Sequence, residues 1–228
     1  MAKTGPFDEH HEQYDRWFEE HADFYEAELE AVNALLPPSR HGGLEVGVGT
    51  GRFAARLAVP MGIEPSGAMA ERAAELGIDV HPGVAEELPF DNESFAYVLM
   101  VTTLCFVDDP VQAFAEAFRV LRPGGCIVIG FIDRESEIGR SYVARRNDSV
   151  FYRDARFFTT EDVLALLSRA GFLDPVAKQT LLPGERPQVV RDGYGTGAFV
   201  ALRERKPLKK PWVDAPFSTN RGIGQSCK

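Results

Sequence analysis

The sequence predicts an α/β fold in which a mostly parallel sheet carries helices on both faces. Three observations support this prediction. Strands and helices alternate along the 228 residues, a short apolar strand at 44–46 leads into glycines at 47, 49 and 51, and apolar residues repeat at helical spacing near the N-terminus. Alternating strands and helices form parallel sheets through right-handed crossovers, and ligands bind beyond the carboxyl ends of the strands, where the strand order reverses.

The first element expected is a helix that ends at Pro37-Pro38. Its apolar stripe consists of Tyr14, Trp17, Phe18, Phe24, Tyr25, Leu29, Val32 and Leu36. Its other face is acidic, because residues 1–30 contain ten carboxylates and two basic side chains. Their net charge of −8 nearly equals the net charge of −9 of the whole chain. An acidic helix with one apolar stripe suits a lid that opens and closes over a site.

Strands and helices then alternate along the rest of the chain. The expected strands are 43–47, 60–64, 79–82, 96–102, 126–132, 172–182 and 197–203. The expected helices are 50–57, 66–77, 109–121 and 159–171, with N-caps at Ser66 and Asp109, a capping box at Thr159, and ends at Gly77 and Gly171. Residues 133–158 are rich in arginine and are expected to be irregular.

The turn after the first strand, LEVGVGTGR at 44–52, is the most informative segment. Glycines at this spacing let the backbone turn sharply, with positive φ available, and leave the peptide groups open to a ligand. A helix that begins at residue 50 or 51 would point its free N–H groups at that ligand. Dinucleotide-binding turns place the third glycine one residue later, so this spacing disfavours a nicotinamide reductase.

The form E-x-G-x-G-x-G resembles the first motif of class I S-adenosylmethionine (SAM) methyltransferases of the small-molecule "methyltransferase 11" type. Four further segments agree with that family in order and spacing: 61–66, 83–90, 95–106 and 116–125. The resemblance implies a Rossmann-like three-layer sandwich. Its mostly parallel seven-stranded sheet would have the order 3-2-1-4-5-7-6, with helices on both faces, an antiparallel seventh strand and an N-terminal lid helix.

The resemblance also implies a cofactor and its binding site. The cofactor would be SAM and the product S-adenosylhomocysteine (SAH). Glu64, at the end of the second strand, would hold both ribose hydroxyls, and the segment 83–90 would border the adenine. The residues assigned to the cofactor are Glu45, Gly47, Gly49, Gly51, Glu64, Pro65, Met69, Ala85, Glu86, Val101 and Thr102. No metal ligand is expected.

Two positions depart from the family pattern. The aspartate expected near the adenine is Val84, and the aspartate that opens the fourth strand is Ala96. We interpret the first departure as adenine bound by backbone groups of Ala85 and Glu86 together with apolar packing. The same departures favour the main alternative, a catalytically idle protein that binds SAM or SAH and has a regulatory or interaction role. A nicotinamide reductase is the third hypothesis.

The predicted reaction needs little covalent help from the protein. An activated methyl group reacts once a nucleophile is placed in line, and a base is needed only where that nucleophile must first lose a proton. No catalytic dyad is evident. The candidate bases are His10, His11, His21, Tyr14 and Asp108. Tyr14 is preferred, in a lid or substrate-positioning role, because it lies on the apolar stripe of the expected lid helix, whereas His10, His11 and His21 are expected at the surface.

The predicted partner is a small-molecule methyl acceptor, and the sequence leaves its class open. Acidic residues near the entrance would favour an amine. Arginines of the 134–156 segment could instead bind a carboxylate or phosphate; they are Arg134, Arg140, Arg145, Arg146, Arg153 and Arg156. The net charge of −9 disfavours a nucleic-acid substrate, because phosphate contacts supply most of such affinity.

The domain prediction has three parts: an acidic lid helix at 1–38, a SAM-binding domain at 39–204 and a basic, proline-rich tail at 205–228. The tail is expected to trail in solvent or to dock on the acidic helix. No apolar run approaches a membrane span, and the N-terminus has no apolar signal core. Three cysteines without paired spacing argue against a disulfide framework, so the cytoplasm is expected. The oligomeric state stays open.

Overall fold

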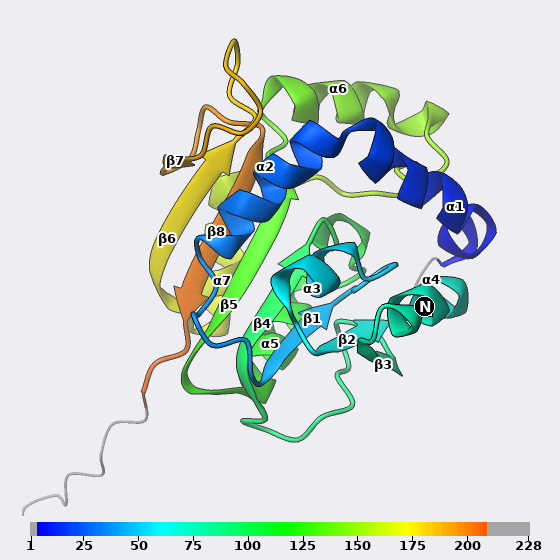
Figure 1. Ribbon diagram of the computed structural model, residues 1–228. Helices are drawn as coiled ribbons and strands as arrows, with labels where there is room; N and C mark the ends of the chain where they lie inside the picture. Colours follow the sequence, from blue (N-terminus) through cyan, green and yellow to red (C-terminus); the bar gives the residue numbers. More distant parts are fainter. Residues whose placement is uncertain (1–3, 209–228) are drawn as a thin grey trace, which may run out of the picture.

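One sheet of eight strands organises the computed structural model of the chain, which describes residues 4–208 (Figure 1). Its strand order is β3-β2-β1-β4-β5-β8-β6-β7. The strands are β1 (Gly43–Val46), β2 (Met61–Glu64), β3 (Asp79–Pro82), β4 (Phe95–Val101), β5 (Leu121–Ile132), β6 (Leu173–Thr180), β7 (Arg191–Asp192) and β8 (Phe199–Arg205). The first five strands pair in parallel, and β8 runs antiparallel to both β5 and β6.

The predicted strand order is confirmed, because β8 is the expected seventh strand and lies between β5 and β6. The predicted count of seven is wrong by one short edge strand. β7 is two residues long and pairs through Lys178 and Gln179 of β6. A pair of residues held in a sheet only by its neighbour carries no periodic pattern of its own, so the sequence did not indicate it.

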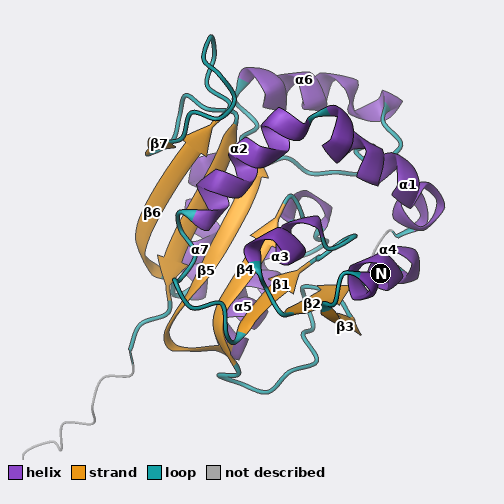
Figure 2. Ribbon diagram, viewed as in Figure 1, coloured by secondary structure: helices purple, strands orange, loops and turns teal. Residues whose placement is uncertain are grey.

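Helices cover both faces of the sheet (Figure 2). They are α1 (Gly5–Glu20), α2 (Ala22–Asn33), α3 (Arg52–Leu57), α4 (Gly67–Glu75), α5 (Pro110–Val120), α6 (Glu137–Arg145) and α7 (Thr160–Ala170), with 3-10 turns η1 (Leu104–Phe106) and η2 (Arg146–Asp148). The predicted caps are confirmed at Ser66, Asp109, Thr159 and Gly171. α2 and α3 pack on one face of the sheet, and α5 and α7 pack on the other.

The central strand β4 is buried on both faces, because helices cover both sides of a parallel sheet. Tyr97, Leu99 and Val101 join the cluster under α2 and α3, whereas Val98 and Met100 join the cluster under α5 and α7. The strand order reverses between β1 and β4. The carboxyl ends of β1, β2 and β4 therefore meet at the place where this kind of sheet binds ligands.

The N-terminal region forms two helices rather than the single helix predicted. The break lies at His21, whose φ of −120° and ψ of 39° are not helical. α2 packs against β5, β6 and β8, and buries Tyr25, Leu29 and Val32 in the core. Periodicity could not find this break, because the apolar spacing stays in phase across His21. Only α1 has the peripheral position that a lid requires.

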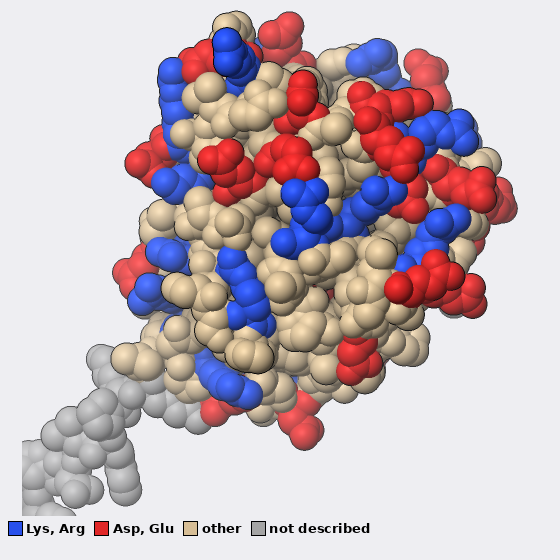
Figure 3. Space-filling model, viewed as in Figure 1, with Lys and Arg blue, Asp and Glu red and all other residues tan. Residues whose placement is uncertain are grey.

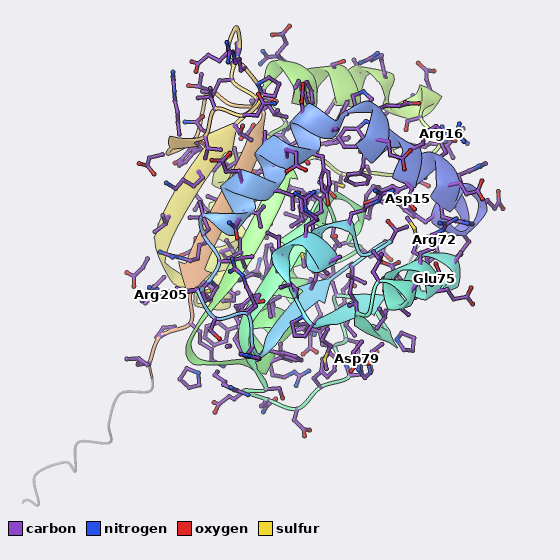
Figure 4. All side chains as sticks on the ribbon, viewed as in Figure 1. Asp15, Arg16, Arg72, Glu75, Asp79 and Arg205 are labelled. Atoms are coloured by element: carbon purple, nitrogen blue, oxygen red, sulfur yellow. The ribbon has the colours of Figure 1, made fainter. Side chains whose placement is uncertain are left out.

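Polar contacts attach α1 to the two turns that follow β1 and β2. The Ser66 hydroxyl donates to Asp8 at 2.6 Å, and the Thr50 hydroxyl donates to Asp15 at 2.7 Å. Arg52 Nε also donates to Asp15, at 2.9 Å. Figure 4 shows Asp15 on α1 beside Arg72 on α4, and their charged atoms lie 3.8 Å apart.

Several acidic side chains of α1 and α2 thus have basic partners within the domain. In addition to the Asp15 contacts, Arg56 of α3 forms two hydrogen bonds with Glu26 of α2, at 2.7 and 3.0 Å. Figure 3 shows this face of the molecule, where acidic and basic side chains alternate. Docking of the basic tail on these helices remains a prediction, since residues 209–228 lie outside the described part of the chain.

The segment 133–158 is partly helical, which corrects the prediction that it is irregular. Ser136 caps α6 by accepting a hydrogen bond from the Gly139 N–H at 2.9 Å. The sequence did not favour a helix there, because Gly139 lowers the helix propensity of a segment whose apolar residues form no clear helical stripe. Gly139 is fixed by packing, since a Cβ would lie 2.0 Å from the Asp133 carbonyl oxygen. No helix in residues 4–208 is long and apolar enough to cross a membrane.

Deleting residues 1–20 should leave a cooperatively folded domain, whereas deleting residues 1–36 should prevent folding. The first deletion removes the polar attachments of α1, and the second removes core residues worth about 1.5–3 kcal/mol each. Thermal denaturation followed by circular dichroism measures both. A cooperative transition in the protein that lacks residues 1–36 would show that α2 is dispensable, and would contradict the prediction that folding requires α2 but not α1.

Candidate functional site

The three glycines after β1 adopt positive φ, and each serves a different purpose. A Cβ on Gly47 would lie 2.2 Å from Thr103 Cγ2, so this glycine permits contact with the turn after β4. A Cβ on Gly51 would lie 2.7 Å from Ile78 Cδ1 and 3.1 Å from Ala73 of α4, so this glycine permits close packing of α4. A Cβ on Gly49 would find its nearest atom, the Tyr14 hydroxyl, at 3.6 Å, which is an ordinary van der Waals contact. Gly49 is therefore the least crowded of the three glycines and lies beneath Tyr14.

The Glu64 carboxylate connects the turns after β1 and β2. It accepts hydrogen bonds from the backbone N–H of Gly49 and of Ser66, both at 2.9 Å. Burial raises the pKa of Glu64 above its ordinary value, although these two donors oppose the shift. The side chain borders a cavity, so the remaining acceptor positions of the carboxylate are available to hydroxyl groups of a ligand.

This cofactor cavity, as we call it, has a volume of about 540 Å³ and opens at the carboxyl ends of β1, β2 and β4. The predicted cofactor residues that line it are Gly47, Gly49, Glu64, Pro65, Met69, Ala85, Glu86, Val101 and Thr102. Val84 also lines it, at the position where the family pattern has aspartate. Its volume lies in the range of small-molecule sites, roughly 300–1,000 Å³.

Glu45 and Gly51, the other two predicted cofactor residues, lie behind the cavity wall. Gly51 is occupied by its contact with α4. Glu45 is buried beneath the glycine turn, where the Ala54 N–H donates to its carboxylate and burial raises its pKa well above the ordinary value. Its Oε2 has no hydrogen-bond partner within residues 4–208. Both residues shape the turn from behind rather than forming its surface.

Thr102 occupies the turn after β4 in a strained conformation. Its φ is +52°, which costs a β-branched residue roughly 1–3 kcal/mol. The Thr102 N–H donates to the Gly130 carbonyl at 2.8 Å, and the neighbouring Thr103 hydroxyl donates to the Gly47 carbonyl at 3.1 Å. Strain of this kind persists where the surrounding structure fixes the backbone, and it concentrates at functional sites.

A second cavity of about 800 Å³ adjoins the first, and we call it the aromatic cavity. It lies between α1, α2, α6 and residues 149–152, where Figure 1 shows α1 and α6 across the end of the sheet. Phe7, Tyr14, Thr102, Phe106 and Phe151 line both cavities. The rings contact one another closely, since the centroids of Phe7 and Phe106 are 5.0 Å apart and those of Phe7 and Phe151 are 5.5 Å apart.

Tyr14 lies on the wall between the two cavities, with its hydroxyl above the glycine turn. Burial raises the pKa of the Tyr14 phenol above its ordinary value, and the carboxylates of Glu64 and Glu45 add to the shift. The phenol therefore stays protonated near neutral pH. It can donate a hydrogen bond and position a ligand, but it is a poor base.

The other candidate bases are dispersed. His10 and His11 line the aromatic cavity and are half-buried, although the sequence analysis expected them at the surface. His21 is exposed and stacks on Trp17, with ring centroids 4.8 Å apart. Asp108 borders the cofactor cavity. Of the six arginines at 134–156 only Arg156 lines either cavity, so these arginines do not converge on one anion site within the described residues.

Sequence reasoning missed Glu28, which α2 places in the wall of the aromatic cavity. Its side chain is 4% exposed, and burial raises its pKa to about 8. A signal was present, because Glu28 lies between Tyr25 and Val32 on the apolar stripe of the helix. An acidic residue at a buried helix position is uncommon and indicates a special role. No group of three acidic, histidine or cysteine residues in the described chain could hold a metal ion.

Comparisons with known proteins agree with this geometry. A family model described as a methyltransferase domain matches residues 44–129. An uncharacterized protein of Methanocaldococcus jannaschii is 41% identical to this chain over 204 residues, which is 88% of this chain and 98% of the relative.

Solved structures give the same result. A Thermotoga maritima protein described as a SAM-dependent methyltransferase and possible histamine N-methyltransferase is 46% identical, with a TM-score of 0.85, over 89% of this chain and 99% of that one. A Haemonchus contortus phosphoethanolamine N-methyltransferase in complex with SAM shares the fold at 17% identity, with a TM-score of 0.59, over 79% of this chain and 52% of that one.

Glu28→Gln should stabilise the protein at alkaline pH. The folded state keeps its proton on Glu28 up to about pH 8, whereas the unfolded chain releases it near 4.5, so wild-type stability falls as the pH rises through this window. The variant lacks this loss and should be roughly 2–4 kcal/mol more stable than wild type at about pH 9, with little difference at about pH 4. Urea unfolding at both pH values measures this.

The matched control is Glu30→Gln, which neutralises an exposed glutamate on the same helix. This control should change the free energy of unfolding little at either pH. If Glu28→Gln and wild type show the same pH dependence of stability, Glu28 is not held in an apolar environment.

Proposed function

We propose that this chain, which belongs to the class I SAM-dependent methyltransferases, methylates a small-molecule acceptor bound in the aromatic cavity. The observation that carries the proposal is the wall shared by the two cavities. A cofactor in the first cavity and an acceptor in the second would meet at Tyr14, Thr102 and Phe106. No observation favours the idle binding protein or the nicotinamide reductase that the sequence left open.

The cofactor is SAM and the product is SAH, and the cofactor cavity fits them. Glu64 offers a carboxylate to ribose hydroxyls, and Gly49 lines the cavity without a side chain that would obstruct a ligand. Val84 and Ala85 provide an apolar wall and backbone groups for the adenine. When bound, SAM supplies a methyl group that is already activated by the sulfonium.

The residues of the chain would then act mainly by positioning. The Tyr14 hydroxyl and the strained Thr102 turn would orient the reacting groups, which can contribute several kcal/mol without a covalent step. The rings of Phe7, Phe106 and Phe151 would exclude water from the junction of the cavities. The polar contacts of Asp8 and Asp15 with the β1 and β2 turns would hold α1 in the closed position.

The acceptor class to test first is a small amine. The Thermotoga maritima relative is described as a possible histamine N-methyltransferase, and it is 46% identical over 99% of its length. Aromatic walls with few basic residues are suited to an amine, because aromatic faces attract cations.

Glu64→Ala should weaken SAH binding by roughly 30- to 1,000-fold, because the carboxylate would make two charge-assisted hydrogen bonds to the ribose. Isothermal titration calorimetry measures the affinity. The control is Glu75→Ala on α4, which removes an exposed carboxylate and should leave the affinity unchanged. Wild-type affinity in Glu64→Ala would mean that the cofactor does not bind at Glu64.

A panel of primary amines, phenols, carboxylates and thiols tests the reaction, with SAH release as the readout. We expect turnover with a small amine. Tyr14→Phe should lower kcat about tenfold while SAH affinity changes little, because the hydroxyl positions the reacting groups. Tyr194→Phe, at an exposed tyrosine, is the control. SAH binding without turnover on any acceptor would refute the proposal. An unchanged kcat in Tyr14→Phe would show that the Tyr14 hydroxyl has no role in positioning.

A further inference from the structure

Glu28 is a buried carboxyl group without a partner in the described part of the chain. It is 4% exposed, and it forms no hydrogen bond or ion pair with any residue of the described chain from 4 to 208. Buried polar groups are nearly always hydrogen-bonded, and leaving one unpaired destabilises the folded state. The fold tolerates this cost at a position that borders the aromatic cavity rather than the interior of the core.

The carboxyl group shares its cavity with aromatic side chains, because Glu28, Tyr142 and Tyr152 all line the aromatic cavity. Burial raises the pKa of both phenols, and the charge of Glu28 adds to the shift. Tyr142 stacks on Tyr152 with centroids 5.3 Å apart, and Tyr152 stacks on Phe106 with centroids 6.0 Å apart. Stacked ring faces beside a carboxylate form an environment that attracts cations.

The basic side chains that line the aromatic cavity are not paired with Glu28. The other acidic and basic residues of its lining come from α1: Glu9, His10, His11, Glu12, Arg16 and Glu20. None of them forms an ion pair or hydrogen bond with Glu28, Arg16 is exposed, and the glutamates outnumber the arginine three to one. A cationic ligand would therefore supply the positive charge that complements Glu28.

We propose that Glu28 is the specificity-determining residue for the acceptor and that it binds a cationic nitrogen of that acceptor among the rings of Tyr142 and Tyr152. Glu28 lines the aromatic cavity and not the cofactor cavity, so the nitrogen that it binds is distinct from the atom that is methylated. The acceptor class is a small molecule with a nucleophilic nitrogen at one end and a cationic nitrogen at the other. This inference rests on the proposed function.

A permanently charged probe tests the inference without turnover. Benzyltrimethylammonium is titrated into SAH-saturated protein by isothermal titration calorimetry. Glu28→Gln should weaken its binding about 10- to 100-fold, Glu28→Asp should weaken it less because the charge is kept, and Glu30→Gln should leave it unchanged. Equal affinity in wild type and Glu28→Gln, or no binding of the probe to wild type, would overturn the inference.

The pH dependence separates a binding role from a structural one. The probe cannot titrate, so its affinity for wild type should rise as Glu28 ionises through about pH 8. In Glu28→Gln this rise should be absent. His10 and His11, which also line the cavity, are present in both proteins, so the comparison cancels their contribution. The same rise in both proteins would overturn the assignment of Glu28.

A matched pair of acceptors tests the two-nitrogen class. Wild type should have a kcat/KM for 1,3-diaminopropane at least about tenfold above that for propylamine, and Glu28→Gln should remove the difference. Equal kcat/KM values for the two amines in wild type would contradict the two-nitrogen acceptor class. If wild type does not bind SAH, the proposed function is refuted. If wild type binds SAH but not the cationic probe, only the role of Glu28 is refuted.

Discussion

The bonds from two backbone N–H groups to the Glu64 carboxylate organise the functional end of this molecule. Gly49 belongs to the turn after β1 and Ser66 to the turn after β2, so a single side chain holds both turns in register. The same two turns carry α1, because Ser66 donates to Asp8 and Thr50 donates to Asp15. The floor of the cofactor cavity and the attachment of the helix above it therefore depend on one buried group.

The site stores unfavourable free energy in several places. Burial raises the pKa of Glu28, Glu45 and Glu64, which means that each carboxylate would be more stable in water. Thr102 adds backbone strain at the end of β4. Such groups persist only where packing elsewhere outweighs them, and the doubly covered strands β4 and β5 supply that packing. A site of this kind is pre-organised to interact with ligands that satisfy its polar groups.

The position of α1 explains how a surface helix can complete a buried site. Its apolar side meets Phe106 and Phe151, while its acidic side meets arginines of the domain, so both faces have partners. These ion pairs are partly exposed, and pairs of this kind contribute little free energy each. α1 buries only Phe18 in the core cluster, whereas α2 buries Tyr25, Ala27, Leu29, Ala31 and Val32 there. α1 is thus attached mostly by weak contacts, which is the arrangement that a reversible closure requires.

The sequence by itself determined the alternation of strands and helices, the caps and the glycine turn, because periodicity, capping residues and glycine spacing are local properties. It also indicated Glu64, which follows a buried strand in a recognisable segment. The strand order followed from the resemblance to the methyltransferase family. The distinct tasks of Gly47, Gly49 and Gly51 were decided by the tertiary structure, since each depends on a neighbour remote in sequence: Thr103, Tyr14 and Ile78. The break at His21, the pairing of β7 and the exposure of Glu28 to a cavity likewise depend on which surfaces meet. A helical pattern shows that a residue will be buried, but only the fold decides whether it is buried against the core or against a space for a ligand.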